Sequence, residues 1–205
     1  MSENAYEMKT CQDASQKQRI ITEQRMHRLK YRAFYSMLRE KREDLKTVPF
    51  NCQQNQVLPK VPDKEGYYSR QLYQYHLCVV EHQVDGSMPK EAVHSYKWSE
   101  DESSKGSNQV ASAVHNTLRS AKFEGIREVR LVADGCAGQN KNSTVLFMLL
   151  WWLQNEAPSG ISVVSVVFPV TGYSFLPPDR VFNRIEKDVR KLEEILNPQS
   201  YQMIF

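Results

Sequence analysis

The spacing of apolar residues predicts a long helix followed by a domain of mixed strands and helices. Over residues 14–46, apolar positions recur at mixed intervals of three and four among many arginines and lysines, without an internal Gly or Pro. This pattern indicates a basic amphipathic helix, which Pro49 is expected to end. The polar residues 1–13 are predicted to form a disordered tail.

Residues 47–205 alternate aromatic or β-branched runs with helical patterns. A Pro-punctuated extended segment comes first. The predicted elements that follow are strands at 72–82 and 92–98, a helix from Ser107, a strand at 128–133, a helix at 143–154, a strand at 161–170 and a helix from Pro177. Three strands in a meander, then alternating helices and strands, predict an α/β fold with a mixed sheet and helices on both faces.

Two of these elements are expected to be buried. The helix at 143–154 is apolar nearly all round, which is typical of a helix covered on every side. The strand at 161–170 is rich in β-branched residues and has few polar ones, as expected in the middle of a covered sheet.

Charge is concentrated at the front of the chain. Residues 1–46 hold eleven Lys and Arg against seven Asp and Glu, which gives +4, whereas the whole chain carries +3. The basic helix is therefore a candidate surface for DNA or for pairing with a second copy of the chain. The simpler interpretation is a helix with one solvated face and one packing face.

Several classes of protein are disfavoured. The four cysteines and five histidines lack the spacing of a zinc site, and there is no phosphate-binding loop, dinucleotide fingerprint or nucleophile elbow. The polar amino terminus lacks the features of a signal peptide, and the longest apolar run is far short of the ~20 residues that span a membrane. We expect an intracellular protein, nuclear or cytoplasmic, with no membrane contact and no evident small-molecule substrate.

One carboxylate stands at the end of a predicted strand. Asp134 follows the strand at 128–133, and functional groups gather at the carboxyl ends of strands in open α/β sheets. Asp134 is either an acid in a site or a cap of the following turn. The polar loop after it supplies two possible turn glycines, an amine and three amides, at Gly135, Gly138, Gln139, Asn140, Lys141 and Asn142.

A second acidic cluster opens the last helix. Asp179 and Glu186 lie seven residues apart, so they share one side of that helix. Together with Asp134, such carboxylates are able to hold two Mg²⁺ ions ~3.5–4 Å apart for phosphodiester chemistry. The simpler alternatives are that Asp179 favours the helix start and that Glu186 pairs with Arg190.

Three stretches resemble a family of transposon-derived animal proteins with an RNase H-like, DDE-transposase-type core. They are "LVADGCAGQNKNSTVLFMLLWWL", "YKWSEDESSKGSNQVASAVHNTL" and "TGYSFLPPDRVFNRIEK". The family pattern has a strand ending Asp-x-Cys-x-Gly-Gln-Asn-Lys-Asn and later Gly-His-Ser-x-x-Pro-x-Asp-Arg-x-Phe. The resemblance covers about residue 20 to the end, and it implies that 47–205 is an RNase H-like domain from a longer transposase-like protein.

The resemblance also implies Mg²⁺-dependent DNA cleavage and strand transfer, with Asp134 as the second acid and Asp179 or Glu186 as the third. Two positions depart from the pattern: Asn51 stands where the family has the first Asp, and Tyr173 where it has His. A neutral amide does not bridge two divalent ions, and a phenol titrating near ~10 poorly replaces an imidazole near ~6.5. The implied site is degenerate and binds Mg²⁺ weakly or not at all. The alternative is a non-catalytic module that binds nucleic acid or protein.

Overall fold

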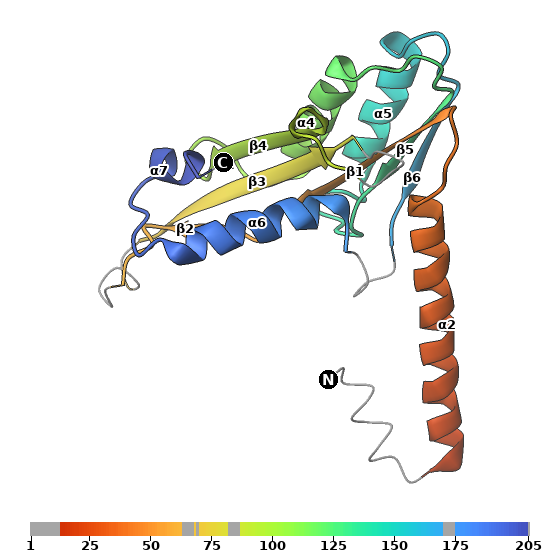
Figure 1. The fold of residues 1–205 in the computed structure, drawn as a ribbon, viewed down its shortest axis with the longest axis horizontal. Coiled ribbons are helices and arrows are strands. Elements are labelled where there is room, and N and C mark those ends of the chain that lie inside the picture. Colours follow the sequence, from red (N-terminus) through yellow and green to blue (C-terminus); the bar gives the residue numbers. More distant parts are fainter. Residues whose placement is uncertain (1–12, 63–67, 69, 82–86, 170–174, 205) are drawn as a thin grey trace.

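The structure is a computed structural model that describes residues 13–62, 68, 70–81, 87–169 and 175–204. Within these ranges the chain forms a mixed open sheet of six strands with five α-helices (Figure 1). The strands are β1 (Leu45–Cys52), β2 (Gln56–Leu58), β3 (Leu72–Val80), β4 (Val93–Ser99), β5 (Glu128–Val132) and β6 (Val163–Val167). The predicted α/β class with a mixed sheet is confirmed.

The sheet begins as a meander and continues as parallel strands. β3 pairs antiparallel with β1, β2 and β4, whereas β5 is parallel to β1 and β6 is parallel to β5. β1 and β2 pair with successive parts of β3, so they share one position in the sheet. The strand order is therefore β4, β3, β1 with β2, β5, β6, and the predicted three-strand meander is confirmed.

Helices cover both faces of this sheet, as predicted. α4 (Ser107–Ser120) and α5 (Ser143–Asn155) pack on one face, where their buried side chains meet Phe50, Leu77 and Leu131. α6 (Pro177–Lys191) packs on the other face, where Phe182 and Ile185 meet Cys78 and Val80. A short 3₁₀ turn (Lys90–Ala92) precedes β4, and α7 (Pro198–Gln202) follows α6 and buries Tyr201 beside it.

The front helix, α2, is shorter than predicted. It spans Ala14–Leu38 instead of 14–46, and the chain then enters β1, which contains Pro49. Leu45, Val48 and Phe50 are buried against neighbouring strands, and this burial favours a strand over a longer helix. The predicted tail 1–13 lies outside the described residues apart from Asp13, whose carboxylate caps α2 by accepting from the N–H of Ser15 at 2.9 Å.

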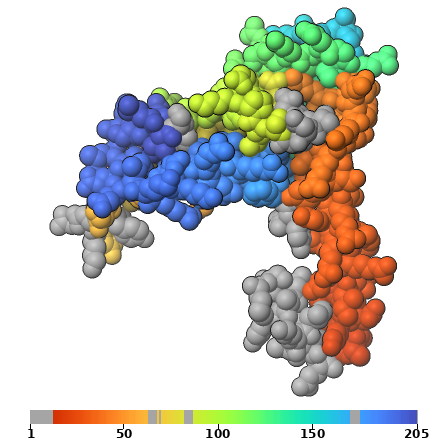
Figure 2. All heavy atoms as spheres, viewed as in Figure 1, coloured from red at the N-terminus to blue at the C-terminus, as the bar shows by residue number. Residues whose placement is uncertain are grey.

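Among the described residues, the buried contacts of α2 with the domain lie near its carboxyl end. Phe34 and Leu38 are buried against Val132 and Leu176, whereas the rest of the helix stands away from the sheet (Figures 1 and 2). Among the described residues, no helix is both long enough and apolar enough to cross a bilayer.

Two burial predictions are wrong. In α5 only Val145, Leu149 and Trp152 are buried, and the opposite side of the helix is open to solvent. β6 lies at the edge of the sheet, and Val163 is 48% exposed. An all-apolar sequence does not indicate which side of an element is covered, because that depends on which elements fold next to it.

Candidate functional site

Three of the predicted site residues meet at one edge of the sheet. β1 and β5 are parallel, with Pro49 opposite Val132, so Asn51 and Asp134 follow at the same carboxyl edge. α6 begins at this edge, and its first turn carries Asp179. Segments far apart in the sequence therefore place an amide and two acids close together.

Asn51 binds Asp179 directly. Its side-chain Nδ2 donates to Asp179 Oδ1 at 2.9 Å, and its Oδ1 accepts from the backbone N–H of Cys52 at 2.9 Å. The second oxygen of Asp179, Oδ2, accepts from the N–H of Leu176 at 2.7 Å, so this carboxylate also caps α6. The amide consequently fills the position beside Asp179 where the resemblance implies a carboxylate.

The environment of Asp179 disfavours its charge. Burial raises the pKa of this carboxyl above its ordinary value, and the negative charge of Asp134 raises it further. The hydrogen bonds from Leu176 and Asn51 act in the opposite direction, but burial is the largest effect. The negative charge of Asp134 is the smallest of these effects on the pKa of Asp179.

Asp134 is held by the loop that follows it. Its Oδ1 accepts from the N–H of Cys136 at 3.2 Å and from the side-chain amide of Asn140. Asn140 is only 1% exposed, so it is a fixed part of the loop. The turn-capping interpretation of Asp134 is therefore correct, and it coexists with the position of this acid at the sheet edge.

The other polar residues of the loop make contacts that do not involve Asp134. Asn142 caps α5 by accepting from the N–H of Val145 at 3.1 Å. The amine of Lys141 lies 5.5 Å from the ring centre of Phe168, and the N–H of Gln139 donates to the carbonyl of Cys136 at 3.3 Å. These contacts shape the loop.

Glycine is not required at two positions where the sequence indicated sharp turns. Gly135 and Gly138 have open space where a Cβ would stand. Among the described glycines, only Gly125 has a positive φ, of 75°. The turn after β5 therefore does not depend on the conformational freedom of glycine at these two positions.

Two predicted site residues, Glu186 and Tyr173, are not seen in the contact between Asn51 and Asp179. Glu186 lies two turns further along α6, about 10 Å along the helix axis from Asp179, and it pairs with Arg190 at 3.5 Å. Tyr173 lies outside the described residues. Of the two candidates for the third acid, only Asp179 contacts Asn51.

Lys105 belongs to the site, although sequence reasoning did not select it. Its Nζ donates to the carbonyl of Gln53 at 2.7 Å and to Oδ1 of Asn55 at 2.8 Å, which ties the segment after β1 to the loop before α4. Burial lowers the pKa of this amine, and Cys52, Cys136 and Asp134 act in the opposite direction. In the sequence this lysine is one of many polar loop residues, and only the fold brings it near Asp134.

These residues do not fit a two-metal site. Both oxygens of Asp179 already accept hydrogen bonds, and Asn51 presents an N–H donor where a metal requires an oxygen ligand. Within the described part of the chain, no cluster of three or more His, Cys, Asp or Glu side chains is arranged to hold a metal ion. Asp134 and Asp179 remain as two acids without the third carboxylate that the resemblance implies.

No protein-family model matches the sequence, and a search of curated proteins finds no match either. The fold and site define an α/β protein with a mixed open sheet that carries two acids and an amide at its carboxyl edge.

Proposed function

We propose that this chain is a transposase-derived, RNase H-like domain whose metal-dependent DNA cleavage and strand transfer have been lost. Two kinds of observation support the proposal. One is the sequence resemblance, above all the Gly-Gln-Asn-Lys-Asn stretch after Asp134. The other is the order of elements, a meander followed by parallel strands and a final helix that begins at the site edge, which is the arrangement that the resemblance implies.

The hydrogen bond from Asn51 to Asp179 carries the proposal that cleavage is lost. Two-metal phosphodiester chemistry uses carboxylates that bind both ions, and the ions stabilise the attacking and leaving oxygens. In this chain the shared position holds a neutral amide that donates to Asp179. The two remaining acids give a formal charge of −2 in place of −3, and burial already disfavours the charged form of Asp179.

A plasmid-nicking assay tests the proposal. Wild-type protein, Asn51→Asp, and Asn51→Asp combined with Asp134→Asn are each incubated with supercoiled DNA and Mg²⁺ or Mn²⁺. We expect wild-type protein to nick no faster than the Asp134→Asn protein, whereas Asn51→Asp gains metal-dependent nicking that the double variant lacks. Metal-dependent nicking by the wild-type protein that Asp134→Asn abolishes would contradict the loss of cleavage.

A second candidate function is nucleic-acid binding without cleavage, and a charged stripe on α6 supports it. Arg180, Arg184, Lys187 and Lys191 are spaced i, i+4, i+7 and i+11, so they lie on one exposed side of α6 over about 17 Å. With Phe175, Asn183 and Asp188 they line a hollow of about 480 Å³. In the described part of the chain, Arg180, Arg184 and Lys187 form no ion pair, whereas Lys191 pairs with Asp188 at 2.7 Å.

The stripe changes which surface we propose for the nucleic acid. The sequence favours α2 as the basic surface, but α6 presents its cations in a row that starts one residue after Asp179. The three cations of this row that form no ion pair with described residues suit a phosphate backbone, because each neutralised phosphate releases a counterion. We therefore place the proposed nucleic-acid contact on α6.

A further inference from the structure

The outer side of α5 is apolar and carries no charge. The helix contains no Asp, Glu, Lys, Arg or His, and four large apolar side chains on it are strongly exposed: Leu146 by 47%, Phe147 by 68%, Leu150 by 53% and Trp151 by 50%. Together they expose on the order of 400 Å² of apolar surface, within the range in which the largest apolar patch of a monomer is often functional.

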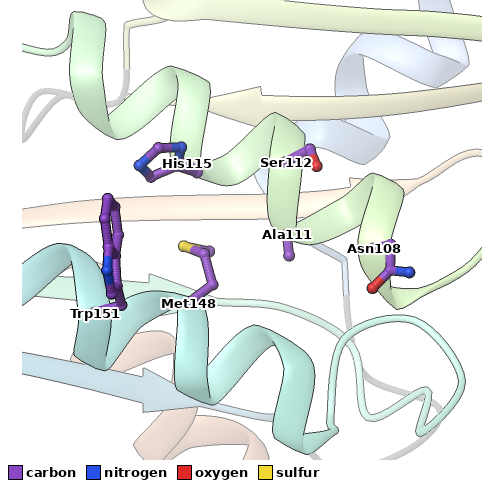
Figure 3. A pocket seen from close by; sticks show the side chains of 6 residues that line it. All are labelled: Asn108, Ala111, Ser112, His115, Met148 and Trp151. Carbon is purple, nitrogen blue, oxygen red and sulfur yellow. The ribbon is translucent and has the colours of Figure 1, made fainter.

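A hollow lies beside this surface, between α5 and α4. It has a volume of about 380 Å³ and is lined by Asn108, Ala111, Ser112, His115, Met148 and Trp151. Figure 3 shows Trp151 and Met148 of α5 facing His115 of α4 across it. The ring of His115 lies edge-on to Trp151 at 5.7 Å, and its Nε2 is hydrogen-bonded to Glu156 at 2.7 Å. These contacts fix the wall of the hollow.

A protruding side chain stands one turn away from the hollow on the same helix. At 100° per residue, Phe147 lies at the centre of the exposed arc of α5. Leu146 and Leu150 lie on one flank of Phe147, and Trp151 lies on the flank that faces α4. The surface therefore combines a projecting aromatic ring with an open hollow of about 380 Å³, about 6 Å apart along the helix.

We propose that this surface joins two copies of the chain, with their α5 helices packed antiparallel about a two-fold axis. A two-fold interface requires that each residue i contacts j of the other copy while j contacts i. An axis midway between Phe147 and Trp151 satisfies this requirement, because each Phe147 then enters the hollow beside Trp151 of the other copy.

The chemistry of the surface favours a second copy over other occupants. The four exposed side chains bring no charge into the contact, and the rim residues Asn108, Ser112 and Gln154 are neutral and polar. A carboxylate near the hollow, that of Glu156, is already hydrogen-bonded to His115 at 2.7 Å. The basic helix α2 or a nucleic acid would instead lose hydration of its charges against an apolar surface.

The area of the apolar surface suits a weak, reversible dimer. Two copies of the four apolar side chains supply on the order of 800 Å², below the ~1,200 Å² at which stable interfaces begin, so the dimer is expected to depend on concentration. This dimer does not depend on the metal site or on nucleic-acid binding.

Sedimentation velocity over micromolar concentrations tests the proposal on the full chain. We expect a concentration-dependent dimer whose association weakens about tenfold or more with Phe147→Glu, and likewise with Trp151→Lys, since both change the centre of the interface. An equimolar mixture of these two variants should associate again. In that mixed pair the new carboxylate at position 147 meets the new ammonium at position 151, and the other Phe147–Trp151 contact stays native.

Two control variants have similar exposure on other surfaces. Leu29→Glu changes α2, where Leu29 is 50% exposed, and Leu196→Glu changes the segment before α7, where Leu196 is 59% exposed. Both should leave the dimer intact. The proposal is overturned by a wild-type monomer at all concentrations, by a dimer that withstands Phe147→Glu, by loss of the dimer with Leu29→Glu or Leu196→Glu, or by a mixture that does not recover. Recovery in the mixture also shows that both variants are folded.

Discussion

The side-chain amide of Asn51 donates a hydrogen bond to Asp179 across 2.9 Å, where β1 ends and α6 begins. This bond joins two segments that are 128 residues apart in the sequence. It satisfies a half-buried carboxylate whose charge is disfavoured by burial and by Asp134. The contact therefore stabilises the fold where the end of β1 meets the first turn of α6.

Replacing the amide of Asn51 with an acid should destabilise the protein and allow it to bind a divalent metal ion. We expect Asn51→Asp to lower the free energy of unfolding by about 1–3 kcal/mol at neutral pH, because repulsion replaces a hydrogen bond. Millimolar Mg²⁺ or Mn²⁺ should restore most of this loss, and should change the wild-type protein little. Urea unfolding with and without metal measures both effects.

Asn51→Leu is the control for that change, because it removes the hydrogen bond without adding a charge. It should lose stability and gain nothing from metal. Equal stabilisation of wild-type protein and Asn51→Asp by Mg²⁺ would contradict the role assigned to the amide.

The raised pKa of Asp179 predicts an unusual pH dependence. The folded protein holds this proton to higher pH than the unfolded chain does, so the contribution to stability is complete below the ordinary value of 3.8 and is lost as pH rises through the folded pKa. Relative to Asp179→Asn, the wild-type protein should become less stable as pH increases over this range. Urea unfolding of both proteins at a series of pH values measures the difference.

The pKa of Asp179 should also depend on the charge of Asp134. Asp134→Asn removes the negative charge that raises the pKa of Asp179, so we expect that pKa to fall. A carbon-detected NMR titration of the Asp179 carboxyl follows the change directly. An unchanged pKa would show that the two acids do not share a site.

The buried His76 should affect stability in the opposite direction, so that the protein becomes less stable as pH falls. It is 1% exposed, its Nδ1 donates to Oε1 of Gln53 at 3.0 Å, and Ser95 lies against Nε2. Burial, with smaller effects from Lys97 and Lys105, lowers the pKa of His76 to about 3. Because the unfolded chain binds this proton near 6.5, the stabilisation is complete above that value and is lost as pH falls towards the folded pKa.

The size of this pH effect follows from the difference between the pKa values of His76 in the unfolded and folded chain. Between about pH 6.5 and pH 5 the free energy of unfolding should fall by about 2 kcal/mol on account of His76. A His76→Gln variant, which keeps a polar side chain at this position, should lose this part of the pH dependence. Parallel slopes for the two proteins over this range would contradict the assignment.

Much of the fold follows from local patterns in the sequence. The runs at 72–82 and 128–133 form strands close to their predicted bounds, and Asp134 could be selected because it directly follows such a run. The last helix starts at Pro177, as the double proline predicts. In each of these cases the residues near the element are sufficient to define it.

Local sequence patterns do not predict the features that depend on residues distant in the chain. Residues 39–46 carry charges that suit a helix or a loop equally well, and the chain leaves the helix because Leu45 and Phe50 are buried in a sheet. The exposed side of α5 and the edge position of β6 depend on where the sheet ends. Lys105 joins the site only because the loop before α4 folds back onto Gln53.

Neutralising the α6 stripe should weaken nucleic-acid binding and reduce its dependence on salt. We expect Arg184→Gln combined with Lys187→Gln to lower affinity for duplex DNA about tenfold, and to reduce the slope of log K against log salt by about 2, since each lost phosphate contact removes ~0.9. Fluorescence anisotropy at several salt concentrations gives both quantities. The matched control, Arg25→Gln with Arg28→Gln on α2, removes two cations from the other basic surface and should leave the slope nearly unchanged. If the α2 pair reduces the slope and the α6 pair does not, the nucleic acid binds along the projecting helix.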